Sequence, residues 1–406
     1  MRGWWLIAAL CGPAAAQDLP VASAAGDQAR QAVERGDYMA ARRVLEGAIA
    51  AAGPAGPDYY TLGMWQQITP MLTGELPLDG LSRGRRVPPA DAATIAQIKA
   101  ATARPALAWI VRHARATRIV ILNEAHYSPR DRAFALSVAR ALRPLGYRYL
   151  AAETFETGDD PARAASVARL AADGFVRRDT GYYTHDPVFA GYLREALKLG
   201  YQPVAYESTS AQDAQGPVRD TREAGEADNL RAFLIAHPGA RLLVHVGHGH
   251  VLETPAPGAR AMMAARLKQR SGIDPLTVDQ TSLTDLQPGL GEAYRLAAIK
   301  AGSRPAILFT GDRPLLIGGG GTDVQVVHPA RATRFGRPGW LATLGGRPVT
   351  VPPALLPRTG ERLVQAFAAD APADAVPLDQ VLVTAGVPAP SLMLPPRVRV
   401  RFETQD

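Results

Sequence analysis

The chain has 406 residues, of which 47% are hydrophobic, so it is long enough for two or three domains with ordinary globular cores. Its formal net charge is +7 and its pI is about 9.7, yet 45 Lys and Arg are spread against 38 Asp and Glu without a long run of one sign. Because no basic stripe is interleaved with aromatic residues, the composition argues against a nucleic-acid partner.

Residues 1–16 predict a signal peptide. A basic residue precedes the apolar run Trp4–Leu10, and three alanines then supply small residues for cleavage. The run is too short to span a bilayer, and no later stretch predicts a transmembrane segment. The only cysteine, Cys11, follows a leucine rather than the small residue that a lipoprotein signal needs. We therefore expect an exported protein, periplasmic or secreted, whose mature chain has no disulfide and no thiol nucleophile.

Residues 17–92 predict a helical N-terminal region followed by a linker. Two short amphipathic patterns within residues 25–65 flank Gly36, which suits the turn between two helices. The pair resembles one tetratricopeptide unit, but such arrays need several repeats to be stable, so a helical cap on the main domain is favoured. Frequent Pro and Gly between residues 70 and 92 predict a linker or a covering loop.

Helix and strand patterns alternate from residue 93 to residue 325. Helices are expected at 93–111, 131–145, 161–173, 187–199, 222–237 and 261–269. Strands are expected at 118–122, 147–152, 202–206, 242–246 and 306–310. The alternation predicts an α/β domain, a mainly parallel sheet with helices on both faces and right-handed crossovers. Residues 326–406 combine frequent Pro and Gly with short β-prone pieces, which predicts a small β-rich C-terminal region with no sign of catalytic residues.

Polar groups suited to chemistry follow these strands. Glu124 and His126 come after strand 118–122, and His248 and His250 come after strand 242–246. Two further strands end in an acid; these acids are Glu153 and Glu207. A strand-end His or Glu on its own is more often a capping or solvated group. Because ligands bind at the carboxyl ends of strands in open α/β sheets, we expect these groups to face one pocket.

Arginines begin two of the expected helices. Arg130 and Arg132 stand at the start of helix 131–145, and Arg222 stands at the start of helix 222–237. A cation at the start of helix 131–145 opposes the helix dipole. We therefore expect an anion near Arg130 and Arg132, either a substrate carboxylate or a developing oxyanion.

These motifs resemble those of the erythromycin-esterase, haem-uptake (ChaN-like) and Tiki superfamily over about residues 95 to 310. Four elements carry the resemblance: Asn123-Glu124-Ala125-His126 with Arg132 behind it, Glu153, Arg222-Glu223 with Ala227 and Asn229, and Gly247-His248-Gly249-His250-Val251. The family's usual Gly before the first Glu is Asn123 here. The spacing of Glu124 and His126 is that of the haem-uptake branch.

The resemblance implies a hydrolytic site. His126 would act as general base on a water molecule, with Glu124 or Glu153 orienting it. His248 or His250 would polarise the carbonyl or protonate the leaving group. Arg132 and Arg222 would hold an anionic substrate or stabilise the oxyanion. Tyr127 and Glu207 are further candidates for substrate binding. Because the sequence has no Gly-x-Ser-x-Gly elbow, direct attack by water on an ester, lactone or amide is preferred over a covalent intermediate.

Other functions use the same residues. Glu124, His126 and His248 are candidate ligands of a Zn or Mn ion, as in a Tiki-like metal-dependent protease. His126 or a tyrosine could instead ligate haem in a ChaN-like iron-uptake protein. The candidate tyrosines are Tyr127, Tyr182 and Tyr183, although packing is the simpler explanation for them. A further alternative is a degenerate member of the superfamily that serves as an interaction scaffold.

Overall fold

The computed structural model describes residues 23–53, 56–78, 88–155, 157, 161–287, 289–318 and 320–406. The predicted signal peptide, residues 1–16, lies outside the described residues, as does the centre of the predicted linker. Within the described ranges, no helix combines the length and apolar composition that crossing a membrane requires.

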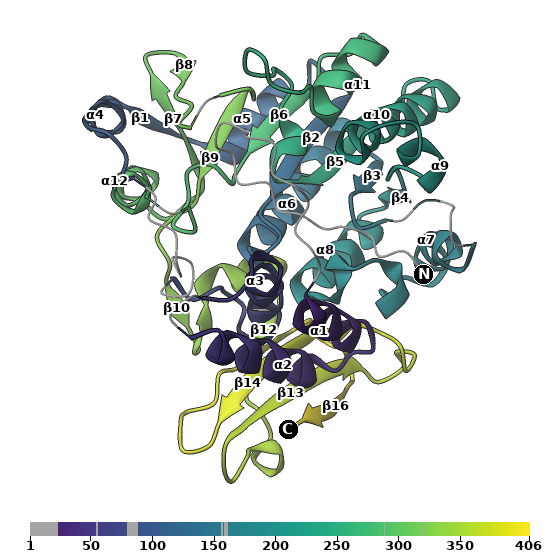
Figure 1. Ribbon diagram of the computed structural model, residues 1–406, viewed down its shortest axis with the longest axis vertical. Helices are drawn as coiled ribbons and strands as arrows, with labels where there is room; N and C mark the ends of the chain where they lie inside the picture. The colour runs from purple at the N-terminus through teal and green to yellow at the C-terminus, as the bar shows by residue number, and fades with distance from the viewer. Residues whose placement is uncertain are drawn as a thin grey trace.

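A nine-stranded sheet forms the centre of the protein, in the order β1-β7-β9-β6-β2-β5-β3-β4, with β8 paired to β7 (Figure 1). The parallel strands are β2 (Ile119–Glu124), β3 (Tyr149–Ala152), β4 (Gln202–Val204), β5 (Leu242–Gly247), β6 (Leu276–Asp279) and β9 (Val324–Val327). The antiparallel strands lie at one end of the sheet and are β1 (Thr102–Pro105), β7 (Ala306–Thr310) and β8 (Arg313–Pro314).

Helices cover both faces of this sheet, as its buried strands require. In β2, Val120 and Leu122 belong to one apolar cluster, whereas Ile119 and Ile121 belong to another on the opposite face. The first face is covered by α5 (Ala106–His113), α6 (Pro129–Leu142), α7 (Pro161–Asp173) and α8 (Pro187–Lys198). The second is covered by α10 (Val218–Ala236) and α11 (Met263–Ser271). The predicted fold class, a mainly parallel α/β sheet with helices on both faces, is confirmed.

Some elements differ from the sequence prediction. The expected helix 93–111 is two helices, α4 (Ala92–Ala100) and α5, separated by β1. Residues 102–105 pair with β7, and Pro105 cannot continue a helix. Within the α/β region, β6, β8, β9, α9 (Ser210–Asp213) and α12 (Gly291–Ala301) were also not predicted. Thr277 and Asp279 interrupt the apolar run of β6, which explains why no strand was expected there.

The N-terminal helices pack against the C-terminal region of the chain. They are α1 (Ala24–Glu34), α2 (Tyr38–Ala51) and α3 (Tyr59–Thr73). Their apolar cluster includes Leu363 of the C-terminal sheet, with Leu382 and Tyr182 at its margin. In Figure 1, α1 and α2 (purple) lie directly beside the yellow C-terminal strands. The helices therefore join the C-terminal sheet to the α/β region, rather than only capping the latter.

The C-terminal region is β-rich, as expected. Its main sheet contains β13 (Glu361–Ala368), β14 (Asp379–Thr384) and β16 (Val400–Gln405). Two smaller sheets pair β12 (Arg347–Val349) with β15 (Leu392–Leu394) and β10 (Thr333–Arg334) with β11 (Arg337–Pro338). The short 3₁₀ helices are η3 (Arg143–Leu145), η4 (Arg178–Thr180), η5 (Tyr183–His185), η6 (His248–Val251), η7 (Gly339–Leu344) and η8 (Pro353–Leu355).

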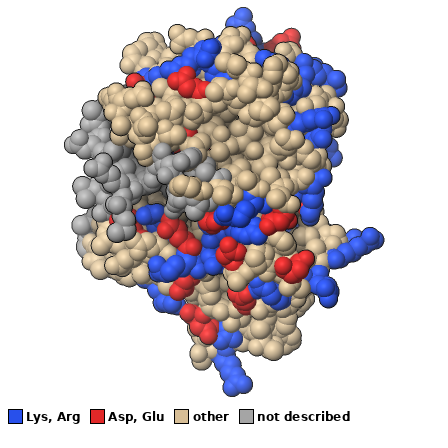
Figure 2. All heavy atoms as spheres, turned by 90° about the vertical axis from the view of Figure 1, so that its right-hand side faces the viewer, with Lys and Arg blue, Asp and Glu red and all other residues tan. Residues whose placement is uncertain are grey.

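Charged side chains of both signs are mixed on the face shown in Figure 2, most densely across its lower half. On the lower half of this face, positive and negative side chains lie next to one another rather than in separate patches of one sign.

The packing of the N-terminal helices on the C-terminal sheet predicts a large effect of Leu363→Ala. Leu363 is fully buried in that cluster, so its truncation should lower the free energy of unfolding by about 2–5 kcal/mol. Leu356→Ala is the matched control, since Leu356 is 40% exposed and its loss should cost under about 0.5 kcal/mol. Urea unfolding of both variants measures the difference, and equal losses would show that the cluster does not join the two regions.

Candidate functional site

The ends of β2 and β5 lie side by side and bring two distant segments together. The strands are parallel neighbours, with Glu124 in register with Gly247. After β2 the chain turns into α6, and after β5 it continues as η6. The rings of His126 and His248 are 5.2 Å apart and nearly perpendicular. The two predicted strand ends therefore contribute to one cluster of polar side chains.

Glu124 is a buried carboxylate whose two oxygens both accept hydrogen bonds. Arg132 donates to it through Nε at 2.6 Å and through Nη2 at 2.7 Å. His126 donates through Nδ1 at 3.0 Å. Burial raises the pKa of Glu124, but Arg132 and His126 outweigh burial and hold that pKa well below its usual range. The carboxylate is therefore charged, and it favours the His126 tautomer that carries its proton on Nδ1.

Arg132 holds Glu124 in place and has little access to a substrate. Its side chain is 1% exposed, and it also donates to Asp186 at 2.7 Å and to the carbonyl of His126 at 3.0 Å. Pro129 begins α6, so Arg132 lies in the first turn, from which a side chain can point back toward the strand end. The anion expected near this arginine is thus Glu124 together with Asp186, both parts of the protein. Arg130, by contrast, pairs with Asp285 at 3.1 Å.

Glu153 follows β3 and connects His126 to the backbone of β5. One of its oxygens accepts the N–H of Gly247, and the other accepts Nη2 of Arg222 at 3.0 Å. His126 Nε2 lies 3.9 Å from the same Oε1 atom. Burial raises the pKa of Glu153, but His126, His250 and Arg222 together lower it to about 2. Position 247 requires glycine, because a Cβ there would overlap both the His126 ring and the Glu153 carboxylate.

His248 and Tyr183 lie beside His126, and each has a buried polar atom without a hydrogen-bond partner. His248 has a backbone φ of +31°, and its Nε2 is buried without a hydrogen bond. Burial and the nearby His126 lower the pKa of His248 to about 3, so its imidazole is neutral at pH 7. Tyr183 stacks on His126 with ring centroids 4.0 Å apart, and its hydroxyl is likewise buried and unpartnered. Both groups are free to meet a ligand.

A second cluster of charges surrounds Arg222. Its guanidinium contacts Glu153, Glu207 and Glu226, each at 3.0 Å. The side chain is 25% exposed, so this cluster is the part of the site that reaches solvent. Burial, together with Glu226 and Glu153, raises the pKa of Glu207 well above its ordinary value despite Arg222. Because α10 begins at Val218, Arg222 does not begin this helix, and the predicted start at residue 222 was wrong.

His250 belongs to this second cluster rather than to the His126 pair. Its Nδ1 lies 3.1 Å from Glu223 and 3.2 Å from Glu226. Glu223, Glu226 and His250 each offer one atom that could bind a metal ion, and these atoms all lie within 4.8 Å of one another. Among the described residues, no other set of three or more His, Cys, Asp or Glu side chains meets this criterion. The three residues predicted to hold a metal, Glu124, His126 and His248, do not form such a group, and Arg132 already donates to both oxygens of Glu124.

The tyrosines differ in position. Tyr127 is buried against Leu76 and Leu286, and its ring lies 5.8 Å from that of His248. It therefore borders the site as a wall. Tyr182 packs beside Met64 of α3, to whose sulfur its hydroxyl donates at 3.8 Å.

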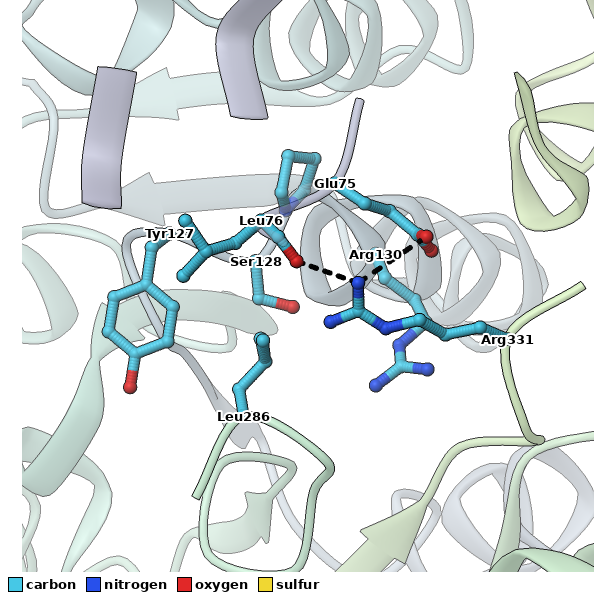
Figure 3. Close-up of a pocket in the computed structure, with 8 residues that line it drawn as sticks. Glu75, Leu76, Tyr127, Ser128, Arg130, Leu286 and Arg331 are labelled. Carbon is cyan, nitrogen blue, oxygen red and sulfur yellow. Dashed lines mark hydrogen bonds and ion pairs between the residues drawn. The ribbon is translucent and has the colours of Figure 1, made fainter. Parts of the chain in front are cut away.

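A separate small pocket lies beside Tyr127, at the start of α6 (Figure 3). Figure 3 shows the guanidinium of Arg331 directed at the carbonyl of Leu76 and at Glu75. Arg331 and Arg130 both also contact Asp285. The cations of this pocket are therefore neutralised by the protein itself.

Some residues of the site were not predicted from the sequence. Glu226, Asp186 and His245 all contact predicted site residues. The spacing of Glu223 and Glu226, three apart on one helix, is the signal that could have indicated Glu226. Asp186 reaches the site from the N-cap of α8, and the sequence pattern does not reveal that this helix end lies beside β2.

Comparisons with known proteins give distant structural likeness only. No protein-family model and no curated protein sequence matches the chain. RRSP, a MARTX toxin effector domain from Vibrio vulnificus CMCP6, is similar at 14% identity and a TM-score of 0.32, over 61% of this chain and 54% of that one. Two structures described as bacterial protein toxins give 12% and 14% identity and TM-scores of 0.30 and 0.29. They cover 60% and 59% of this chain and 55% of each of theirs. The chain thus spans about half the length of these structures, and their names do not include the families that the motifs resemble.

Buried histidines predict that the protein loses stability in acid. Burial lowers the pKa of both His185 and His245 from 6.5 to about 4. Between these values the unfolded chain binds more protons, so the free energy of unfolding falls as pH drops from about 6.5 toward 4. Each histidine contributes at most about 1.4 kcal/mol per pH unit.

Urea unfolding at several pH values measures this loss. In His185→Gln the pH slope between 6.5 and 4 should be smaller than in the wild type. The comparison isolates one histidine from the carboxylates that titrate over the same range. An unchanged slope would contradict the buried, neutral state of His185.

Proposed function

We propose that this protein is an exported hydrolase in which His126 activates a water molecule for attack on an ester, lactone or amide. The observation that carries the proposal is the hydrogen bond from His126 Nδ1 to the buried carboxylate of Glu124. It leaves Nε2 with a lone pair, as a general base requires. When Nε2 takes a proton, the negative charge of Glu124 stabilises the resulting imidazolium.

The surroundings of Nε2 suit a bound water. Nε2 lies 3.9 Å from Glu153, which is too far for a direct hydrogen bond and compatible with a bridging group. Glu153 is charged and is fixed by Gly247 and Arg222. A water between the imidazole and this carboxylate could donate one hydrogen to each. Its oxygen lone pair would then be directed at a carbonyl carbon.

His248 is the better candidate for polarising the carbonyl. Its imidazole is neutral at pH 7, so it would donate a hydrogen bond to the developing oxyanion rather than transfer a proton as an imidazolium. The unpartnered Nε2 of His248 supports this role. His250 is less suited, because its Nδ1 faces two carboxylates of the second cluster. Arg222 is partly exposed, but Glu153, Glu207 and Glu226 already pair with its guanidinium, so we do not assign it to the binding of an anionic substrate.

A screen of chromogenic esters, lactones and peptides, with and without chelator, tests the proposal. His126→Ala should lower turnover by about 10²-fold or more, because general-base catalysis is lost. His113→Ala is the matched control, since His113 is exposed at the end of α5 and should leave activity unchanged. Equal activity in His126→Ala and the wild type would refute the proposal.

The same protein samples separate hydrolysis from haem binding. Titration with haemin followed by absorbance would give a Soret band, lost in His126→Ala, if the ChaN-like alternative were correct. We expect no His126-dependent band, because His126 is only 6% exposed and Tyr183 covers one face of its ring.

A further inference from the structure

Three side chains beside Arg222 converge in the manner of metal ligands. Glu223 and Glu226 are three residues apart on α10, so they project from the same side of the helix. His250 approaches them from η6, with Nδ1 at 3.1 Å from Glu223 Oε1 and at 3.2 Å from Glu226 Oε2. A tetrahedral zinc ion with bonds of about 2.0–2.1 Å holds its ligand atoms about 3.3 Å apart. The observed spacings are close to this value.

The atoms that converge lack the hydrogen bonds that burial demands. Glu226 is 1% exposed, yet neither of its oxygens has a hydrogen-bond partner among the described residues, and nor does Nδ1 of His250. Arg222 Nε lies 3.0 Å from Glu226 Oε1, but its single hydrogen is donated to Glu207 at 3.2 Å. A carboxylate buried in this state is costly unless another group satisfies it. This deficit is independent of the spacing and points to a missing partner for these oxygens.

The remaining contacts of the cluster also suit a bound cation. The second oxygen of Glu223 accepts the N–H of Met263 at 2.5 Å, which orients the carboxylate and leaves Oε1 directed at His250. The second nitrogen of His250 lies 3.3 Å from Arg222 Nη1 and 3.9 Å from Glu153, a carboxylate of the kind that commonly accepts the free N–H of a metal-bound histidine. Arg222 contacts three carboxylates of the cluster, so negative charge exceeds its single positive charge.

We propose that Glu223, Glu226 and His250 form a binding site for one divalent transition-metal ion, with zinc as the expected occupant. One imidazole nitrogen and two carboxylate oxygens are ligands that zinc accepts, and water would complete the coordination. The ion would replace the proton shared at Nδ1 of His250. The site is distinct from the Glu124, His126 and His248 set, and binding at it does not depend on hydrolysis.

Metal titration of the full chain tests this site directly. Protein freed of metal with a chelator and then desalted is titrated with ZnCl₂ by calorimetry, and with CoCl₂ by absorbance. We expect one ion per chain, bound at micromolar concentration or tighter, and release of a proton on binding. Glu226→Gln and Glu223→Gln should each weaken zinc binding at least about tenfold. Glu253→Gln, which removes an acid that contacts Lys268 instead, should bind like the wild type.

Two further measurements identify the residues that bind the zinc ion. X-ray absorption of the wild-type zinc complex should show one imidazole in the first coordination shell, which does not require any variant to fold. His248→Ala should retain zinc binding. Absence of stoichiometric zinc binding to the folded wild type would overturn the proposal, and would mean that a proton alone bridges His250 and the two glutamates. Two imidazoles in the coordination shell would place the metal at His126 and His248 and would also overturn the proposal. The same holds if His248→Ala loses zinc binding while Glu226→Gln retains it.

Discussion

The buried ion pair between Glu124 and Arg132 is the interaction on which the rest of the site depends. It joins the end of β2 to the first turn of α6, and through Asp186 it also reaches the start of α8. Removing one partner of such a pair typically costs about 3–5 kcal/mol, because the other charge remains buried. An apolar pair of the same size would often be at least as stable. We therefore attribute the pair to positioning: it supplies a fixed negative charge to His126 at a site almost closed to solvent.

Glu153 connects the two halves of the polar site. On one side it lies near Nε2 of His126, and on the other it accepts a hydrogen bond from Arg222. The first half holds neutral or unpartnered groups next to a fixed base, which suits chemistry on a neutral carbonyl. The second half holds an excess of carboxylates around Arg222, which suits the binding of a cation. The two halves are thus chemically different although they share one residue.

Sequence patterns predicted the parts of this arrangement that depend on local order. The apolar run Ile119–Leu122 followed by Glu124 and His126 identified a buried strand with polar groups at its end, and the alternation of elements indicated a parallel sheet. Parallel neighbours place their carboxyl ends at the same edge, so the approach of His248 to His126 followed from topology alone. The role of Arg132 could not be predicted in this way. It depends on Asp186, which comes 54 residues later in the chain and approaches Arg132 only through tertiary packing. Likewise, the sequence does not show which face of α10 points toward the site, so Glu226 was not among the predicted site residues.

The tautomer of His126 tests the central claim most directly. Nitrogen-15 NMR of the ring, assigned by the loss of its signals in His126→Asn, distinguishes a protonated from an unprotonated nitrogen at neutral pH. If Glu124 fixes the imidazole as described, Nδ1 carries the proton and Nε2 does not. A spectrum with the proton on Nε2 would contradict the orientation of His126 by Glu124, and with it the assignment of His126 as the base.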